Sequence, residues 1–488
     1  MLRIIDTPGL GSQNEDVGVV QPMWTDEQQT IITSPMGNQV VYAAPGSGKT
    51  AVLTQHIASV IENKQAAPAE IMAVTFTKQA ALEMRTRLGT RTSLSFRQAE
   101  TVRIGTFHAQ VFQWVLRHTP DVPVILRQTE QLQFLSAAMK AAGWQGGHRP
   151  HAILSVLSAV KSTWPHRPLP DRLHRIIALY EILKRRNGRW DFDDILSYWC
   201  QLSDDGRVLS VPKTRYILVD EFQDTNQIQW YVLQRLVEIS GCHLFAVGDD
   251  DQAIYGFRGA DPAWLIQFPR RMERSAVHYL SRNFRSDIRI VESAGQLIQH
   301  NRHRTAKQMV PHSQRLGDCV VIVHHDTAGE YQWIQRRVAY LSAQRDLYTI
   351  GILARTRVEL ARLHAQAGAF LNNGEGVSVE FRTFHDAKGK EWDEVHILDV
   401  VEKNPFLAEW SEDSAFLEEE RRLFYVAMTR ARHSLLLHWP RHIDGRRTQR
   451  SRFVAEAGLA GECMDAKDVR VEAGKPTVQY SAGVPVRR

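Results

Sequence analysis

Ala43-Ala44-Pro45-Gly46-Ser47-Gly48-Lys49-Thr50 is the stretch that decides the fold of this chain. Ahead of it, the apolar residues 39–43 predict a short buried strand, and behind it the apolar spacing over 51–62 predicts a helix. A strand, a turn of small residues ending in Gly-Lys-Thr and a helix form a phosphate-binding loop, because backbone N–H groups and the helix N-terminus both attract an anion. Ala43 departs from the usual pattern, which has its first glycine there. The strand–turn–helix context still predicts a phosphate site.

The loop and two carboxylates further along predict a site for a nucleoside triphosphate and Mg²⁺. Lys49 can reach the β- and γ-phosphates, and the Thr50 hydroxyl can bind Mg²⁺. Asp220 and Glu221 end the apolar strand 216–221, where the first carboxylate can hold Mg²⁺ and the second can orient the attacking water. The loop residues expected around the phosphates are Ala44, Pro45, Gly46, Ser47, Gly48, Lys49 and Thr50.

Length and composition fit a globular protein of several domains. The 488 residues exceed one compact core, and 43% hydrophobic with 23% charged residues is ordinary for a soluble protein. A net charge of +6 permits a polyanionic partner without requiring one. Cys200, Cys242, Cys319 and Cys463 are too far apart for a zinc or iron–sulfur set, and no apolar run reaches the roughly 18 residues of a membrane helix. We therefore expect a reduced, cytoplasmic protein without a membrane partner.

The apolar pattern predicts an α/β fold in two successive units. Apolar strands that alternate with helical stretches are typical of a parallel sheet covered on both faces. Residues 110 to about 210 have helical periodicity and no strong strand, which predicts an inserted helical subdomain. Further strands of the first sheet are expected at 70–76, 102–108, 216–221 and 243–249. Those of the second unit are expected at 320–324, 349–353, 378–382, 394–399 and 434–438.

Motifs of one known family follow this framework in order along most of the chain. The stretch 217–225, Ile-Leu-Val-Asp-Glu-Phe-Gln-Asp-Thr, resembles motif II of the UvrD/Rep/PcrA group of superfamily 1 helicases. Further stretches that resemble motifs of the same group lie at 24–29, 75–81, 105–108, 191–194, 247–260, 280–286, 383–391 and 419–431. The resemblance extends from about residue 24 to Glu456, and chance agreement at that density is negligible.

The resemblance implies a fold of two tandem RecA-like motor domains, called 1A and 2A, with a helical subdomain 1B inserted in the first. The expected divisions are a weakly ordered leader 1–22, domain 1A at 23–108 with 212–280, insertion 1B at 109–211, domain 2A at 281–460, and a tail 461–488. The larger relatives insert a mobile domain, 2B, before motif V. Here the connector between residue 354 and the motif at 383 is too short to hold one, which puts processive strand separation in doubt more than ATP hydrolysis or translocation.

The resemblance also implies an ATP-dependent translocase or helicase on single-stranded DNA, with 3′ to 5′ polarity and ATP bound between 1A and 2A. Arg285 and Arg430 would act as arginine fingers on the γ-phosphate, a role worth about 10³–10⁵ in rate. Gln252 would sense the same phosphate. Residues implied to contact the rest of the nucleotide are Gln28 at the adenine edge, Phe284 stacked on the adenine and Glu391 near the ribose.

Aromatic and polar residues of the motifs predict the surface that binds the strand. Aromatic faces stack on bases without regard to sequence, at roughly 1–3 kcal/mol each, and hydroxyls and cations meet phosphates. The expected residues are Thr75, Phe76, Thr106, His108, Tyr255, Phe257, Arg258 and His385. The alternative for each aromatic side chain is an ordinary core position. The expected partner is single-stranded DNA or a 3′-tailed duplex, bound without sequence preference and with strong salt dependence.

Two other functions stay open at this point. The short connector is also compatible with a nucleic-acid-binding subunit of a repair or defence complex, in which ATP acts mainly as a switch and a protein partner recruits the chain. A fused nuclease–helicase is disfavoured, because no set of carboxylates and lysine typical of a nuclease lies outside the motif region. The motifs name no pathway, and they do not distinguish DNA from RNA.

Overall fold

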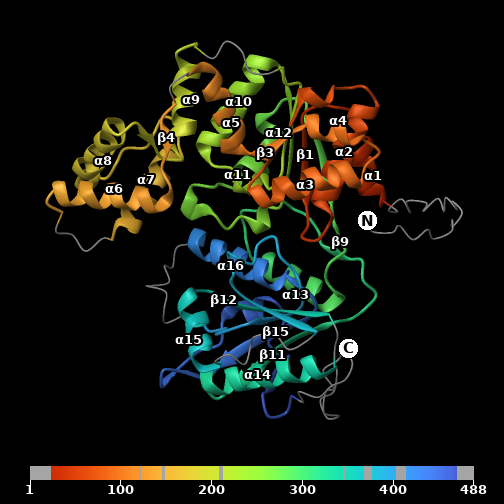
Figure 1. Cartoon of the computed structure of the whole chain (residues 1–488). Helices are drawn as coiled ribbons and strands as arrows, with labels where there is room; N and C mark the ends of the chain where they lie inside the picture. Colours follow the sequence, from red (N-terminus) through yellow and green to blue (C-terminus); the bar gives the residue numbers. More distant parts are fainter. Residues whose placement is uncertain are drawn as a thin grey trace, which may run out of the picture.

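The computed structural model describes residues 24–119, 122–144, 149–207, 213–344, 347–367, 376–402 and 414–469. Two α/β bodies stand one above the other, each built on a six-stranded sheet, and a group of helices projects sideways from the first body (Figure 1). All the strand ladders within these two sheets are parallel. The prediction of an α/β fold with two parallel sheets is confirmed.

The first sheet has the strand order β3-β2-β6-β7-β1-β8. Its strands are β1 (Gln39–Ala43), β2 (Ile71–Thr75), β3 (Arg103–Thr106), β6 (Tyr216–Val219), β7 (His243–Gly248) and β8 (Ala276–Leu280). One face packs on α1 (Asp26–Thr33), α2 (Lys49–Glu62), α3 (Lys78–Thr90) and α4 (Phe96–Thr101). The other face packs on α5 (Phe107–His118), α9 (Asp194–Asp204), α10 (Gln227–Ser240), α11 (Ala263–Ile266) and α12 (Phe268–Arg271). Because helices cover both faces, strands such as β1 and β2 are buried at every position.

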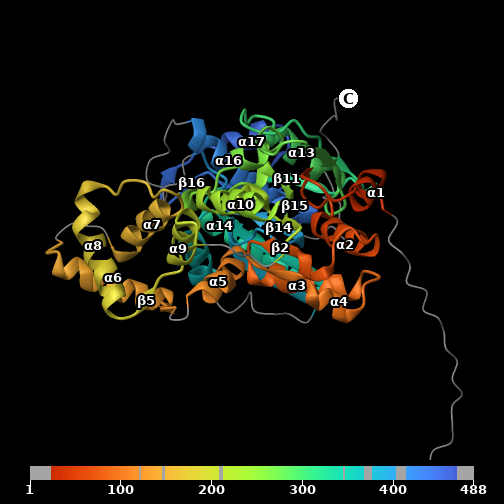
Figure 2. The same ribbon diagram turned by 90° about the horizontal axis from the view of Figure 1, so that it is seen from above.

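Three helices of the predicted insertion 109–211 form a group of their own. A separate apolar core is shared by α6 (Gln128–Ala141), α7 (Pro150–Lys161) and α8 (His174–Arg186). The short strands β4 (Val124–Ile125), ahead of α6, and β5 (Arg189–Trp190), after α8, form a parallel pair. Figure 2 shows the group as a lobe beside the first body. Helices α5 and α9, which lie inside the predicted insertion 109–211, pack in the core of the first sheet instead. The predicted limits of the insertion are therefore too wide.

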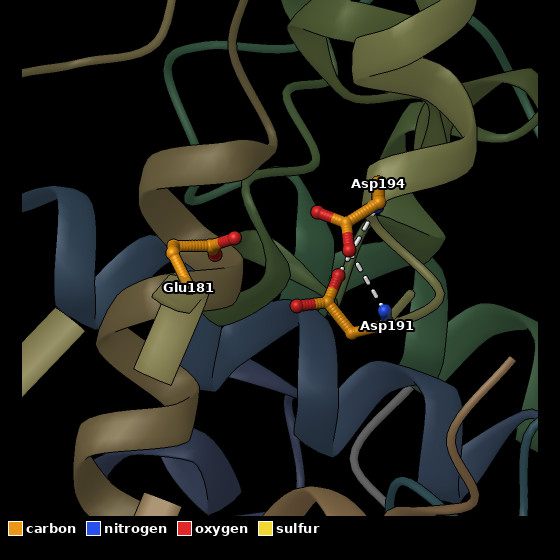
Figure 3. Close-up of side chains that lie close together, drawn as sticks. All are labelled: Glu181, Asp191 and Asp194. Atoms are coloured by element: carbon orange, nitrogen blue, oxygen red, sulfur yellow. Dashed lines mark hydrogen bonds between the residues drawn. The ribbon is translucent and has the colours of Figure 1, made fainter. Parts of the chain in front are cut away.

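A buried ionic network joins the inserted helices to α9. The ammonium groups of Lys161 on α7 and Lys184 on α8 each lie 2.6–3.0 Å from carboxylate oxygens of Glu181, Asp191 and Asp194. Figure 3 shows how these three acidic side chains converge. They form an acidic cluster of the kind that holds a metal ion, but the two ammonium groups already supply its positive charge. The acidic stretch 191–194 thus anchors the inserted lobe.

The second sheet has the order β13-β12-β14-β15-β11-β18. Its strands are β11 (Asp318–His324), β12 (Tyr348–Ala354), β13 (Val377–Thr383), β14 (Trp392–Ile397), β15 (Ala431–Pro440) and β18 (Cys463–Asp465). Its helices are α13 (Ile288–Ile298), α14 (Thr327–Gln344), α15 (Arg357–Ala367), α16 (Ser414–Met428) and α17 (Arg452–Glu456). Two small ladders lie beside it, β9 (Arg282–Asn283) with β10 (Val310–Pro311) and β16 (His442–Ile443) with β17 (Arg446–Arg447).

The second domain extends further than predicted. Strand β18 pairs with β11 through Val321, Ile322 and Val323, so the sheet continues past residue 460, where the sequence placed the end of the domain. A three-residue strand with mixed side chains carries too weak a periodic signal to be recognised from the sequence. The predicted leader 1–22 and the tail beyond residue 469 lie outside the described residues.

A buried histidine in the first domain predicts a loss of stability in acid. His56 contacts the Tyr216 hydroxyl at 2.9 Å and the Ile32 carbonyl oxygen at 3.3 Å, and burial lowers its pKa to about 4. The unfolded chain, with a histidine pKa near 6.5, binds the proton more tightly. The contribution of neutral His56 to the free energy of unfolding is therefore complete above pH 6.5. The free energy of unfolding falls by about 3 kcal/mol as the pH decreases towards 4.

The measurement is the unfolding free energy of the wild type and of His56→Gln at pH 7.5 and pH 4.5. The variant is expected to lose less stability between the two pH values, since the glutamine does not titrate. An equal loss in both proteins would show that His56 does not cause the acid sensitivity.

Candidate functional site

The predicted phosphate loop has the expected local structure. It connects β1 to α2, and Gly46 and Gly48 adopt left-handed backbone conformations with φ of 65° and 81°. These φ values favour glycine over residues with a side chain. Lys49 and Thr50 begin α2, and the Thr50 hydroxyl lies 3.5 Å from Asp220 Oδ2. The loop, the lysine and one predicted Mg²⁺ carboxylate are therefore brought together.

Carbonyl groups of the loop are held by residues from outside it. Asn283 Nδ2 donates to the Pro45 carbonyl oxygen at 2.9 Å, and the Phe284 N–H donates to the Gly46 carbonyl oxygen at 2.9 Å. Gln28 Nε2 donates to the Ser47 carbonyl oxygen at 3.1 Å. These bonds fix the loop while the N–H groups at the start of a helix have no partner within the helix. The loop is thereby shaped to receive an anion.

The carboxylates at the end of β6 differ in their proton affinity. Burial and the neighbouring Glu221 charge raise the pKa of Asp220 to about 7. Burial would raise the pKa of Glu221 as well, but the charges of Lys49 and Lys388 lower it to about 2. Glu221 has a left-handed backbone, with φ of 52°, and accepts a 2.6 Å hydrogen bond from Gln223 Nε2. A fixed, ionised carboxylate beside a lysine suits the activation of a water molecule.

Arg430 reaches across to the first domain. Its Nη2 donates to Gln252 Oε1 at 3.0 Å, and Gln252 Nε2 in turn donates to Asp249 Oδ2 at 2.6 Å. Arg430 is 2% exposed, and burial together with the charge of Arg285 lowers its pKa to about 9. The predicted sensor and one predicted arginine finger are thus in direct contact.

Arg285 lies against the phosphate loop. A Cβ added to Gly46 would lie 2.7 Å from the Arg285 Cβ, so the loop can approach this closely only because residue 46 is glycine. The Arg285 side chain donates to Glu391 Oε2 at 2.6 Å and to the Thr429 carbonyl oxygen at 3.1 Å. Both predicted arginine fingers therefore border the cleft that holds Lys49.

The residues predicted to hold the adenosine are placed around the same loop. Gln28 Oε1 accepts from the Thr25 N–H at 3.1 Å, so its amide is engaged on both sides. Phe284 is 41% exposed, and its ring packs against His312 at 4.7 Å. Glu391 pairs with Arg285. Their predicted contacts with adenine and ribose stay predictions.

Lys388 is a cleft residue to which the sequence analysis gave no role. Its ammonium donates to Asp224 Oδ2 at 2.6 Å and to the Gln252 carbonyl oxygen at 2.9 Å, which ties the second domain to the first. It also lies 5.0 Å from the centre of the Tyr255 ring. The residue stands inside the motif 383–391, but spacing alone does not show that it spans the cleft.

A second lysine, Lys307, forms ion pairs with the three aspartates that follow β7. The ammonium of Lys307 lies 2.9 Å from Asp249 Oδ1 and 2.9 Å from Asp251 Oδ2, and it also pairs with Asp250. Arg304 adds two hydrogen bonds to Asp251, at 2.9 and 2.7 Å. These three carboxylates form an acidic cluster that could hold a metal ion, but the ammonium fills that position. No local motif around residues 304–307 signals this contact.

Five of the predicted strand-binding residues form one aromatic patch across the two domains. Phe76 stacks on Tyr255 with ring centres 5.0 Å apart, and Phe257 lies 6.0 Å from Tyr255 and 5.5 Å from His385. The Arg258 guanidinium lies 5.3 Å from the Tyr255 ring and 5.5 Å from the Phe257 ring. Phe257 is 57% exposed. A partly exposed aromatic cluster with a cation suits base stacking and a phosphate.

The remaining predicted strand residues lie apart from the patch or are already engaged. Thr75 is buried, and its hydroxyl donates to the Thr77 carbonyl oxygen at 3.0 Å. The Thr106 hydroxyl accepts from the Ala109 N–H at 3.4 Å and caps α5. His108 stacks on Phe192 at 4.2 Å, and burial lowers its pKa to about 4. In this conformation the two hydroxyls serve the backbone.

The structure brings a phosphate-type loop, paired carboxylates and arginines from a second parallel-sheet domain together, which is the arrangement that the motifs predicted. The family model of the UvrD/REP helicase N-terminal domain matches residues 24–273, more than half of the chain, and that of the UvrD-like helicase C-terminal domain matches residues 358–442. The chain belongs to the UvrD/REP helicase family.

Three relatives illustrate the similarity to proteins named as bacterial DNA helicases. DNA helicase II of Escherichia coli is 32% identical over 320 residues, which are 60% of this chain and 43% of the relative. PcrA of Bacillus subtilis is 30% identical over 358 residues, 68% of this chain and 47% of the relative. The chain thus spans less than half the length of these two. A probable DNA helicase of Mycoplasma pneumoniae is 28% identical over 441 residues, 84% of this chain and 82% of the relative.

None of the helices in the described ranges is long and apolar enough to cross a membrane.

The contact between Lys388 and Asp224 predicts a measurable coupling between the domains. Replacing Lys388 by Met leaves the Asp224 carboxyl buried without its partner, and we expect a loss of about 3 kcal/mol in unfolding free energy. Replacing Asp224 by Asn as well should recover much of that loss. Urea unfolding of the wild type, Lys388→Met and the double variant measures this coupling. If the double variant lost as much unfolding free energy as Lys388→Met, the ion pair would not join the domains.

Proposed function

We propose that this chain is an ATP-driven motor on single-stranded DNA that moves 3′ to 5′, with ATP hydrolysed between its two sheet domains. The observation that carries this proposal is the hydrogen bond from Arg430 of the second domain to Gln252 of the first, beside Glu221 and Lys49. A nucleotide at the phosphate loop would lie against groups from both domains, so its binding and hydrolysis would change how the domains fit together.

The residues of the cleft fit ATP and Mg²⁺. Lys49 would bind the β- and γ-phosphates, and Thr50 with Asp220 would hold Mg²⁺, which supplies charge neutralisation on the phosphates. Glu221 is held ionised and would orient the attacking water and accept its proton. Arg285 and Arg430 would stabilise the charge that develops on the transferred phosphoryl group. Gln252 would contact the γ-phosphate and, through its hydrogen bond with Arg430, couple that contact to the second domain.

The aromatic patch supports a strand-binding role for the junction of the two domains. Tyr255, Phe257 and Arg258 come from the first domain and His385 from the second, so a base stacked among them would touch both. Rearrangement of the cleft would then shift one half of the patch relative to the other. Binding of this kind does not depend on sequence, which supports single-stranded DNA or a 3′-tailed duplex as the substrate.

We infer that the chain works without a 2B domain. Between the end of β12 at Ala354 and the start of β13 at Val377 lie helix α15 and a short segment outside the described residues. A separate folded domain does not fit in so short a connector. Translocation needs only the two sheet domains, whereas processive unwinding would draw on a protein partner.

The central test is DNA-stimulated ATP hydrolysis by the purified chain. Addition of single-stranded DNA should raise turnover, and Lys49→Ala should abolish it while DNA binding is retained, because Lys49 lies at the phosphate loop and away from the aromatic patch. Glu221→Gln should bind ATP without turning it over. Absence of stimulation in the wild type, or near-normal turnover in Lys49→Ala, would contradict the assignment.

Arg430 supplies a second test of the cleft. Replacement by Ala should lower kcat by about 10³-fold or more, with a much smaller change in ATP affinity, because the arginine acts on charge that develops in the transition state. Arg432→Ala is the matched control, because Arg432 is a half-buried neighbour that pairs with Glu391. Equal falls in kcat and affinity for Arg430→Ala would argue against a transition-state role.

The second candidate function is an ATP-switched nucleic-acid-binding subunit of a larger complex, favoured by the short connector after β12. Displacement of streptavidin from 3′- and 5′-biotinylated strands separates the two. A motor of the proposed polarity displaces streptavidin from the 5′ end faster than from the 3′ end. ATP turnover without any difference between the ends would favour the switch.

A further inference from the structure

A groove of about 740 Å³ lies on the second domain, away from the nucleotide cleft. His324 ends β11, Asp465 ends β18, and Arg441 follows the last residue of β15, so the groove lies at the carboxyl ends of neighbouring strands. Arg430 precedes the first residue of β15, and the ten residues of that strand span about 30 Å. The groove is therefore separate from the cleft, and its volume falls within the range of small-ligand sites.

A buried chain of hydrogen-bonded side chains ends at His324, which lines the groove. His324 Nε2 lies 2.9 Å from His438 Nδ1, and His438 Nε2 lies 2.9 Å from His396 Nδ1. His396 Nε2 lies 3.0 Å from Glu394 Oε1, and Arg337 donates to both oxygens of that carboxylate at 3.0 and 2.9 Å. The three imidazoles and the carboxylate are at most 2% exposed. The chain crosses β14, β15 and β11 in sheet order.

Glu394 fixes the direction of the hydrogen bonds. Burial would raise its pKa, but Arg337 lowers it to about 2, so the carboxylate is ionised and accepts from His396 Nε2. The contacts of His438 and His324 are compatible with an order in which Nε2 of each of these rings donates and Nδ1 accepts. Burial also lowers the pKa of His324 to about 4 and that of His438 well below its usual value, which keeps these rings neutral.

This order leaves an acceptor at the groove. His324 Nδ1 is buried and has no hydrogen-bond partner among the described residues, and His324 lines the groove. A buried polar atom without a partner lowers the stability of the protein. The atom therefore favours a ligand that brings an N–H or O–H group to it.

The rim of the groove is basic. Arg336, Arg441 and Lys467 line it and are exposed, and none of them forms an ion pair with a carboxylate in the described parts of the chain. Asp465 is the acidic residue in the lining. A positive rim above a neutral acceptor matches a ligand with an anionic group at one end and a hydrogen-bond donor at the other.

We propose that this groove is a second nucleotide-binding site, with the phosphate at Arg336, Arg441 and Lys467 and an N–H of the base at His324 Nδ1. A nucleotide has both groups on one molecule, and each of the common bases offers an N–H donor. Free nucleotides and the nucleotide units of a strand share this chemistry, and the experiment separates them. The site does not depend on ATP hydrolysis, so failure of the proposed motor activity leaves its test unaffected.

The test is calorimetric titration of the whole chain with the ATP cleft filled by Mg²⁺ and a non-hydrolysable ATP analogue. One arm uses deoxycytidine monophosphate, and the other a short oligodeoxycytidine. In the double variant Arg336→Ala/Arg441→Ala, affinity for at least one of them should fall about tenfold or more, since two charge-assisted contacts are lost. Loss in the first arm identifies the free nucleotide as the ligand, and loss confined to the second identifies a strand.

The matched control is Arg446→Ala/Arg447→Ala, an exposed arginine pair on β17 of the same domain that does not line the groove. His324→Phe tests the acceptor and should weaken binding of the same ligand, while the arginine variants keep the test valid if that protein does not fold. ATP hydrolysis should be unchanged in both arginine variants. Unchanged affinity for both ligands in the groove variant, or an equal loss in the control, would overturn the proposal.

Discussion

The contact between the phosphate loop and the first residues of the second domain constrains the rest of the structure. The backbone of Phe284 and the side chain of Asn283 bind carbonyl oxygens of the loop, and Arg285 approaches Gly46 more closely than any side chain at residue 46 would allow. The loop belongs to one domain and this segment to the other. A change in the conformation of the loop would therefore change the contacts between the domains. The proposed binding of a nucleotide to this loop would therefore act on both domains.

Charged and polar side chains join the domains at the cleft. Lys388 pairs with Asp224, Lys307 with the aspartates after β7, and Arg430 bonds to Gln252. A buried pair of this kind contributes modest net stability, yet removal of one partner is costly. Such contacts favour discrete arrangements of the domains, and they can open to water with a smaller loss than an apolar interface. This property fits the proposed motor function, in which the cleft would close and open.

The second sheet has different chemistry at its two ends. Arg430 precedes β15 and borders the nucleotide cleft, whereas His324 and Arg441 lie at the carboxyl ends, where open α/β sheets commonly bind ligands. The histidines between them are core residues by burial, and their hydrogen bonds end at His324, whose buried Nδ1 has no partner among the described residues. The nucleotide cleft proposed above and the basic groove thus lie at opposite ends of the same sheet.

The amino-acid sequence by itself determined the local structures and their type. The phosphate loop, the Asp220 and Glu221 pair and the apolar strands are set by residue type and spacing within short windows, and the structure has them where they were predicted. The limits of larger units were less accurate. Helices α5 and α9 were assigned to the insertion and β18 to the tail, because a periodic pattern shows that an element forms but not against which core it packs.

Only the tertiary structure decided which distant charges meet. Lys307 and Lys388 face carboxylates far away in the sequence, and no local pattern encodes such a contact. The same holds for the chain from His324 to Glu394, whose residues are unremarkable in the sequence and become a polar relay only when β11, β15 and β14 lie side by side. The physical reason is that periodicity and turn chemistry act within a few residues, whereas burial, charge pairing and proton order depend on neighbours that the fold supplies.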